Sequence, residues 1–204
     1  MTTLDFTDKI WAFYQRLEKE FINSLNYVAL TEDNYNTYSI EYEKLILSIG
    51  SEIDILCKAL CNEIQRDKHP NQMPQYYAIL SSIPNFMTSK VCCLKQNISF
   101  SPFAEWTDQN RPDWWNVYNK IKHDRINNNN YKKGNLKSTY YALARLYVLC
   151  RFLFRQIDSQ QPYNEPLPVS QIFSMDGWQK YYPMGNGFFY CLRSNGGVGI
   201  VKGN

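Results

Sequence analysis

The sequence predicts a mainly α protein: an up-and-down bundle of four to five helices with a small β-hairpin insert and a short β-containing C-terminal tail. Three observations predict this class. Long segments repeat apolar residues every three or four positions, as amphipathic helices do. A few shorter segments are rich in strand-forming residues. Polar or proline-containing stretches separate these elements.

Two long helices are expected in the first third of the chain. The apolar stripe of the first comprises Ile10, Phe13, Leu17, Phe21, Leu25 and Val28. Asp5 or Thr3 is available to cap its start. After a polar break at residues 31–36, the stripe of the second comprises Tyr42, Leu45, Ile49, Ile53, Leu56, Leu60 and Ile64. The short loop between them predicts an antiparallel pair. Gly50 in the second stripe predicts a place where another helix packs closely.

The middle of the chain changes period and then returns to helix. A short helix is expected at 74–83, and Pro84 ends it. Strand formers at 90–94 and 97–101 predict a hairpin insert at about 90–103. A fourth helix opens with Pro112 near its first turn and should end by 127–130. The last helix begins near Asn135, and its apolar stripe comprises Leu136, Leu143, Leu146, Leu149, Leu153 and Ile157.

The C-terminal residues 159–204 differ in texture from the rest. Three prolines open this stretch, and an aromatic-rich segment follows. Asn195-Gly196 lies between two apolar segments, 188–192 and 198–201, which is a hairpin signal. We therefore expect residues 1–158 to form one helical bundle and residues 159–204 to form an appendage packed on it.

Composition excludes several classes of protein. With 204 residues, 44% hydrophobic and 20% charged, the chain is not a collagen, a disordered tail or a disulfide scaffold. No segment approaches the roughly 20 apolar residues that cross a bilayer, and the first residues lack the features of a signal peptide. We expect a cytoplasmic protein with no membrane partner and with reduced thiols. The C-x-x-x-C spacing of Cys57 and Cys61 fits small buried hydrophobes better than zinc ligands, so no metal or other cofactor is expected.

The charge is unevenly distributed along the chain. From residue 90 to residue 155 there are twelve Lys and Arg against four Asp and Glu, a net of +8, whereas the remaining residues carry a net of −5. A basic half fits a polyanionic partner or an acidic protein surface. Solvated helix faces would give the same count, so both interpretations stay open.

The only plausible catalytic imidazole lies on the fourth helix. The sequence lacks phosphate-loop, dinucleotide, zinc-protease and nucleophile-elbow motifs. His69 lies in a loop before a proline, which leaves His123. At 100° per residue the core side of the helix should carry Trp114, Val117 and Ile121. The opposite side should carry Asn119, His123, Trp115 and Ile126, with Lys122 at its border and Tyr118 at its margin.

This face supports two interpretations. Exposed cations beside an exposed tryptophan are typical of an RNA-binding surface or a protein interface. Alternatively, Asn119 and His123 form a hydrogen bond with each other or cap a neighbouring element, and Trp115 is buried under the hairpin.

The helix order and the stretch W-x-x-Y-N-x-x-K-H-x-R, from Trp115 to Arg125, resemble the HEPN (higher eukaryotes and prokaryotes nucleotide-binding) superfamily. The resemblance spans about residues 5–157. Its members are four- or five-helix bundles, commonly dimeric, and many are metal-independent ribonucleases of toxin–antitoxin, abortive-infection and CRISPR systems. The family motif is Arg, a polar residue that is often Asn, three further residues, and His. Here Asn119 and His123 match, and Tyr118 replaces the arginine.

The resemblance implies roles for these residues. His123 would be the general acid/base and Asn119 would orient it. Contacts to RNA or phosphate would come from Lys120, Lys122, Arg125, Trp115 and Tyr118. Because Tyr118 brings no cation, and losing such a charge contact costs on the order of 10²–10³ in rate, we expect a degenerate motif.

Two functions follow from these observations. The first is a HEPN-like module of a bacterial defence or toxin–antitoxin system that binds RNA or an operon-encoded protein partner, without full nuclease activity. The alternative is a metal-independent RNA endonuclease that uses His123. In both cases the apolar Trp115 and Ile126 on the motif face predict a homodimer, with the Asn119/His123 faces directed toward the dimer cleft.

Overall fold

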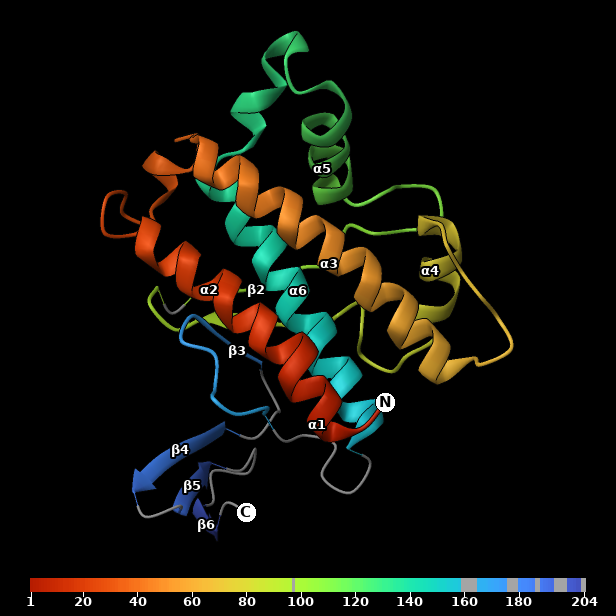
Figure 1. Ribbon diagram of the computed structural model, residues 1–204, viewed down its shortest axis with the longest axis vertical. Coiled ribbons are helices and arrows are strands. Elements are labelled where there is room, and N and C mark those ends of the chain that lie inside the picture. Colours follow the sequence, from red (N-terminus) through yellow and green to blue (C-terminus); the bar gives the residue numbers. More distant parts are fainter. Residues whose placement is uncertain (97, 159–164, 176–179, 186–187, 193–197, 203–204) are drawn as a thin grey trace.

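The computed structural model describes residues 1–96, 98–158, 165–175, 180–185, 188–192 and 198–202. It confirms a mainly α fold (Figure 1). The helices are α1 (Thr3–Phe6), the π-helix η1 (Thr7–Trp11), α2 (Ala12–Ser24), the 3₁₀ turn η2 (Glu32–Asn34), α3 (Ile40–Ile64), α4 (Met73–Leu80), α5 (Asp113–Asp124), η3 (Asn127–Lys133) and α6 (Leu136–Ile157). Each long helix lies where its apolar stripe predicts it, except that α2 ends at Ser24, before Leu25 and Val28 of the predicted stripe.

The strands form two small antiparallel sheets. They are β1 (Val91–Cys93), β2 (Ile98–Phe100), β3 (Phe173–Met175), β4 (Lys180–Gly185), β5 (Phe188–Leu192) and β6 (Val198–Lys202). The first sheet has the order β2-β1-β3 and the second the order β4-β5-β6. Pairing of β1 with β2 confirms the hairpin insert. Pairing of β5 with β6 confirms the second hairpin, whose turn lies outside the described residues.

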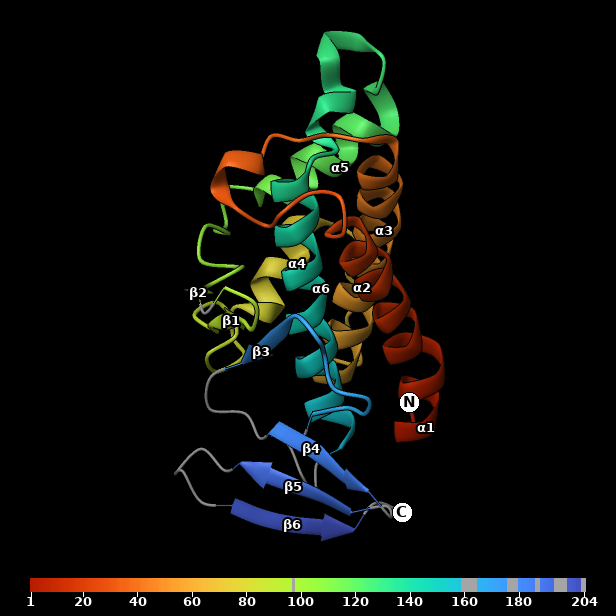
Figure 2. The same ribbon diagram turned by 90° about the vertical axis from the view of Figure 1, so that its left-hand side faces the viewer.

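Helix α6 is the centre of the molecule. Every residue from Ala142 to Phe154 is buried, so this helix is enclosed on all sides rather than along one stripe. Helices α2 and α3 both contact it, and the sheet β2-β1-β3 lies on another side (Figure 2). The sequence predicts a single apolar stripe on this helix. The additional burial comes from the hairpin and from the C-terminal segment.

The first helix differs from its predicted stripe near its start. Thr2 is the N-cap, and its side chain and that of Asp5 form a reciprocal capping box, in place of the expected cap at Asp5 or Thr3. The π-turn η1 follows directly, and it buries Trp11 while Phe13 on the next turn is exposed. A π-turn adds a residue to one turn and so rotates the faces that follow it.

Helix α5 packs closely against α3 at Gly50, and the sequence predicts such a close contact at this glycine. A Cβ atom at this position would lie 2.3 Å from Cδ2 of Tyr118. Only a residue without a side chain lets the Tyr118 ring come this close to the α3 backbone. Tyr118 is therefore part of the core, with 7% of its surface exposed.

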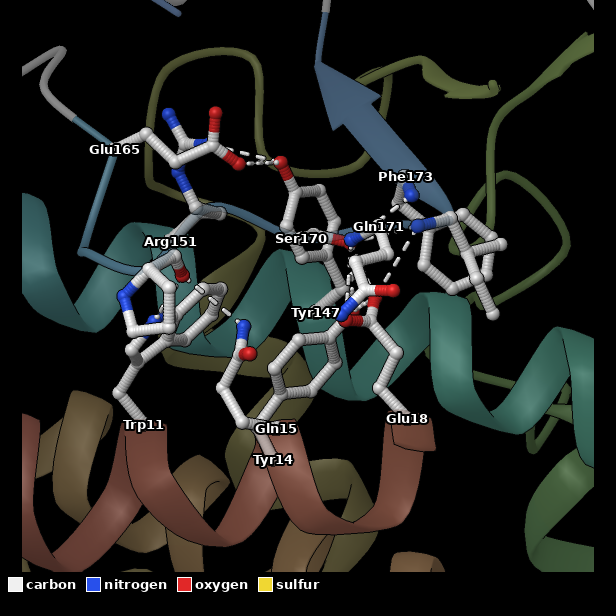
Figure 3. A network of polar contacts seen from close by, with 12 residues as sticks. Trp11, Tyr14, Gln15, Glu18, Tyr147, Arg151, Glu165, Ser170, Gln171 and Phe173 are labelled. Carbon is white, nitrogen blue, oxygen red and sulfur yellow. Dashed lines mark hydrogen bonds and ion pairs between the residues drawn. The ribbon is translucent and has the colours of Figure 1, made fainter. Parts of the chain in front are cut away.

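Residues 165–175 are joined to the bundle by a buried polar network that includes the carboxylate of Glu18 (Figure 3). Glu18 is 1% exposed. Its carboxylate accepts from the Tyr14 hydroxyl at 2.8 Å, from the Ser170 hydroxyl and from the backbone N–H of Gln171 at 3.1 Å. Nearby, the indole N–H of Trp11 donates to the carbonyl oxygen of Pro168 at 2.8 Å.

A buried ion pair forms the second half of this network. Arg151 lies 2.8 Å from Glu165, with side chains 1% and 3% exposed, and Tyr147 donates to the same carboxylate at 2.8 Å. We call Tyr14, Glu18, Tyr147, Arg151, Glu165 and Ser170 the tail latch. Because β3 also pairs with β1, residues 165–175 complete the core.

The C-terminal segment expected to form an appendage, residues 159–204, therefore contains two structurally different parts. Residues 165–175 belong to the bundle, so the expected boundary at residue 158 does not separate two packing units. The sheet β4-β5-β6 lies beyond the end of α6 (Figure 2). Among the described residues, no helix combines the length and apolarity needed to cross a bilayer.

Candidate nucleic-acid interface

Helix α5 and the turn η3 project from one end of the bundle (Figure 1, green). The chain reverses at Asn128 and Asn129, which adopt left-handed φ values of 52° and 54°, a conformation that asparagine tolerates better than most residues. Both carboxylate oxygens of Asp124, at the end of α5, accept hydrogen bonds. Asn127 and Asn130 donate to its carboxylate at 2.6 Å and 3.1 Å. The run of asparagines is thus a structured cap on α5.

Positive charge gathers on this projection. Between residues 114 and 137 there are six Lys and Arg and one acid, Asp124. We call Lys120, Lys122, His123, Arg125, Lys132 and Lys133 the basic tip. All of them are exposed except Lys133, which is half-buried. Among the described residues, Arg125 is the one member that forms an ion pair. The lysines of the tip are therefore available to an anionic partner.

Aromatic rings accompany these cations. The ammonium group of Lys132 lies 5.8 Å from the ring centre of Tyr38 and 5.9 Å from that of Tyr131. The two rings meet edge to face, and Tyr38 is exposed. The Ser39 N–H donates to the carbonyl oxygen of Gly134 at 3.2 Å, which ties the start of α3 to the tip. An exposed ring beside cations is a surface on which a nucleic-acid base can stack.

His123 and Asn119 do not form a catalytic pair in this structure. The Asn119 amide donates to the carbonyl oxygen of Trp115 at 2.8 Å, one turn earlier in the same helix. His123 is exposed, and it forms no hydrogen bond with any described residue. The two side chains share a face, as the sequence predicts, but Asn119 is not placed to orient the imidazole.

Two residues expected at the exposed face are more buried than predicted. Tyr118 lies in the core, with the ammonium group of Lys122 5.2 Å from its ring centre, so its burial does not favour the predicted contact with RNA or phosphate, which stays a prediction. Trp115 is half-buried, and its ring lies 5.5 Å from that of Trp114 and 5.6 Å from that of Tyr118. Helix α5 buries Trp114, Tyr118 and Ile121. Because Gly50 has no side chain, the Tyr118 ring packs against α3 in the core. Val117, which is expected on the core side of the helix, is only half-buried.

Arg125 is held at the base of the tip. Its guanidinium lies 3.7 Å from the carboxylate of Glu43 on α3, and the two side chains are 57% and 7% exposed. The sequence places Arg125 near Lys122 but gives no sign of Glu43, which is far away along the chain. Arg125 thus supports the tip as well as adding charge to it.

Sequence reasoning missed Tyr38, Lys132 and Lys133 as members of this surface. The excess of Lys and Arg between residues 114 and 137 is the signal that could have identified Lys132 and Lys133, because both lie within this range. The contribution of Tyr38 depends on a contact across the fold. Among the described residues, no group of three or more His, Cys, Asp or Glu could hold a metal ion. Comparison with family models, curated proteins and solved structures finds no match.

Proposed function

We propose that this chain is an RNA-binding helical module, HEPN-like by the resemblance of its motif, that contacts the RNA backbone with the basic tip. The observation that carries the proposal is the set of exposed cations at one projecting end. The only acidic residue of that segment, Asp124, already accepts hydrogen bonds from Asn127 and Asn130. Exposed cations without carboxylate partners are the groups that neutralise phosphates. A setting in bacterial defence or a toxin–antitoxin system rests on the resemblance alone.

The test is an RNA titration at two salt concentrations. Four or five phosphate contacts on a single strand would weaken binding by about 50- to 100-fold between about 50 and 200 mM salt. Charge reversal by Lys120→Glu with Lys122→Glu should weaken binding of a labelled single-stranded RNA by at least about tenfold. The matched control is Lys19→Glu with Lys68→Glu, which makes the same change in net charge at exposed positions outside the tip.

Three outcomes decide between the candidates. Equal loss of affinity in the two double variants would mean that net charge, and not the tip, attracts RNA. Absence of RNA binding, together with salt-insensitive association with a co-encoded protein, would favour the protein-partner version of the module. Shortening of the RNA by the wild type and not by His123→Ala would favour the alternative, a metal-independent endonuclease. The observation that supports this alternative is that the His123 imidazole is exposed beside cations that could bind the phosphate.

The homodimer predicted from the sequence is part of the proposal. Since Trp115 is half-buried, the large apolar residue left on that face is Ile126, which is 85% exposed. We expect a dimeric mass by light scattering across a tenfold dilution, and loss of the dimer in Ile126→Lys. A monomeric mass throughout would contradict it.

A further inference from the structure

A pocket lies at the start of α5, the end of this helix that is away from the basic tip. It has a volume of about 340 Å³ between the start of α5, the first half of α6 and the turn after β2, and its walls include Phe100, Trp114, Val117, Tyr141 and Arg145. This volume is at the small end of the range for ligand pockets, about 300–1,000 Å³. Apolar side chains and polar or charged ones share the lining, and the apolar ones are Phe100, Pro102, Trp114, Val117 and Tyr141. The size and the walls suit a small, flat organic molecule.

Arg145 brings a nearly buried positive charge to this pocket. The side chain is 7% exposed, and its Nε donates to the carbonyl oxygen of Pro102 at 2.8 Å. Its guanidinium lies 6.0 Å from the ring centre of Tyr141. Burial lowers the pKa of Arg145 to about 10, so the group is cationic at neutral pH. The negative charges of Glu105 and Asp113 favour its cationic form, but among the described residues Arg145 forms no direct ion pair, and a buried charge without a direct partner is costly.

Trp114 supplies a second donor that has no acceptor. Its side chain is 4% exposed, and its indole N–H is buried and bonds to no described residue. Buried N–H groups in native proteins nearly always have a partner, so an exception calls for an explanation. A ligand oxygen that accepts from both Trp114 and Arg145 would satisfy both groups at once.

The remaining polar residues limit the charge of the ligand. Two carboxylates, Glu105 and Asp113, and one further cation, Lys137, also line the pocket, and all three side chains are exposed. Lys137 and Arg145 balance the two carboxylates, so a singly charged carboxylate ligand meets less repulsion from Glu105 and Asp113 than a doubly charged phosphate monoester does. We infer that the pocket binds the carboxylate of a small aromatic acid, with Arg145 and Trp114 as donors and with Val117 and Tyr141 flanking the ring. This site is separate from the basic tip.

Calorimetric titration with defined probes tests the inference. Indole-3-acetate should bind the wild-type protein, and indole-3-acetamide, which has nearly the same shape and no charge, should bind at least about tenfold more weakly. Phenyl phosphate is the doubly charged probe and should also bind more weakly than indole-3-acetate. Equal affinity for the acid and the amide would overturn the inference, as would no binding of the acid at millimolar concentrations. Tighter binding of phenyl phosphate would overturn the assignment to a carboxylate.

Two variants test whether Arg145 and Trp114 donate hydrogen bonds to the ligand carboxylate. Arg145→Met removes the charge at similar length and should weaken indole-3-acetate binding by about tenfold or more. Trp114→Phe keeps an aromatic ring, removes the unpaired N–H and should weaken binding by about three- to tenfold. If Arg145→Met does not fold, Trp114→Phe and the acid–amide pair still decide the matter. Unchanged affinity in a folded variant would remove that residue from the site.

Discussion

The basic tip and the tail latch are both built from charged residues, and they use charge in opposite ways. At the tip, Lys120 and Lys122 are exposed and form no ion pair with any described residue. In the latch, Glu18, Arg151 and Glu165 are almost completely buried, and each has a partner. The tip is therefore suited to bind something outside the molecule. The latch fixes one segment of the chain, residues 165–175, onto the bundle.

The difference follows from the cost of removing a charge from water. An exposed lysine keeps its hydration, so leaving it without a partner costs nothing in folding, and a surface pair contributes only about 0–1 kcal/mol. A buried carboxylate must recover its lost hydration from hydrogen bonds. Removing one partner of such a group typically costs about 3–5 kcal/mol. Substitutions should therefore separate the two regions clearly, by stability at the latch and by binding at the tip.

The largest expected effect is on the latch carboxylate. Glu18→Ala removes the acceptor of two buried hydroxyls, those of Tyr14 and Ser170. Only one of the two can then donate to the other, and an unsatisfied buried group costs about 1–3 kcal/mol, in addition to the loss of packing. We expect the free energy of unfolding, measured by urea denaturation, to fall by about 3 kcal/mol or more. Glu20→Ala is the control, because this carboxylate is exposed on the same helix and should change stability by less than about 1 kcal/mol. Equal losses in the two variants would contradict the latch.

The latch also explains why part of the fold is not predictable from the sequence. Amphipathic stripes locate the long helices, and Asn195-Gly196 locates a hairpin, because these signals are local. Glu18 lies among the apolar positions of its helix, and its partners Ser170 and Gln171 follow about 150 residues later, so no local pattern indicates why it is buried. The same limit applies to β3, whose pairing with β1 spans 80 residues of the chain.

The candidate site shows the same division between local and distant signals. Asn119 and His123 share a helix face, as their spacing of four residues predicts. The burial of Tyr118 depends on Gly50 of another helix, and a helical wheel drawn for α5 alone places Tyr118 at the margin. The ion pair of Arg125 likewise depends on Glu43. Spacing thus predicts which side chains of one helix lie together, and tertiary packing decides which of them reach solvent.

The second expected effect is a loss of stability at alkaline pH. Burial raises the pKa of Tyr14, Tyr147, Cys57 and Cys150 well above the ordinary values of 10.0 for the phenol and 9.0 for the thiol. The unfolded chain loses these protons at the ordinary values, whereas the folded chain keeps them. Stability is therefore complete below about pH 8 and falls as the pH rises past 9, by up to about 1.4 kcal/mol per pH unit for each group that ionises.

Urea denaturation at about pH 7, 9 and 10 measures this loss. The lowered pKa of Arg145 acts in the opposite direction, but only above about pH 10. The variant Cys57→Ala lacks one of the four groups, so its stability should fall less steeply between about pH 8 and 10. Stability that stays constant from pH 7 to 10 would mean that these thiols and phenols ionise as easily in the folded chain as in the unfolded chain.

A third, smaller effect is expected at Gly50, where the helix that carries the tip is seated. In an open helix, Gly→Ala gains about 1 kcal/mol. Here the new Cβ atom would lie 2.3 Å from the Tyr118 ring, so we expect Gly50→Ala to lose about 1–3 kcal/mol from overpacking. Ser51→Ala, at the exposed neighbouring position, is the control and should be neutral or slightly stabilising. A gain of stability in both variants would show that α5 is not held by this contact.

The smallest expected effect concerns Arg125, an exposed cation of the tip that pairs with a buried carboxylate. Its guanidinium is largely exposed like the rest of the tip, but its partner Glu43 is buried like the carboxylates of the latch. Arg125→Ala should therefore lower the free energy of unfolding by about 1 kcal/mol, more than Lys122→Ala, which removes no ion pair. In RNA titrations the order should reverse, because Lys122 forms no ion pair with any described residue, whereas Arg125 is paired with Glu43. Urea denaturation and RNA titration of the same two variants measure both quantities. If Arg125→Ala left stability unchanged and weakened RNA binding more than Lys122→Ala, Arg125 would belong to the binding surface and its contact with Glu43 would be incidental.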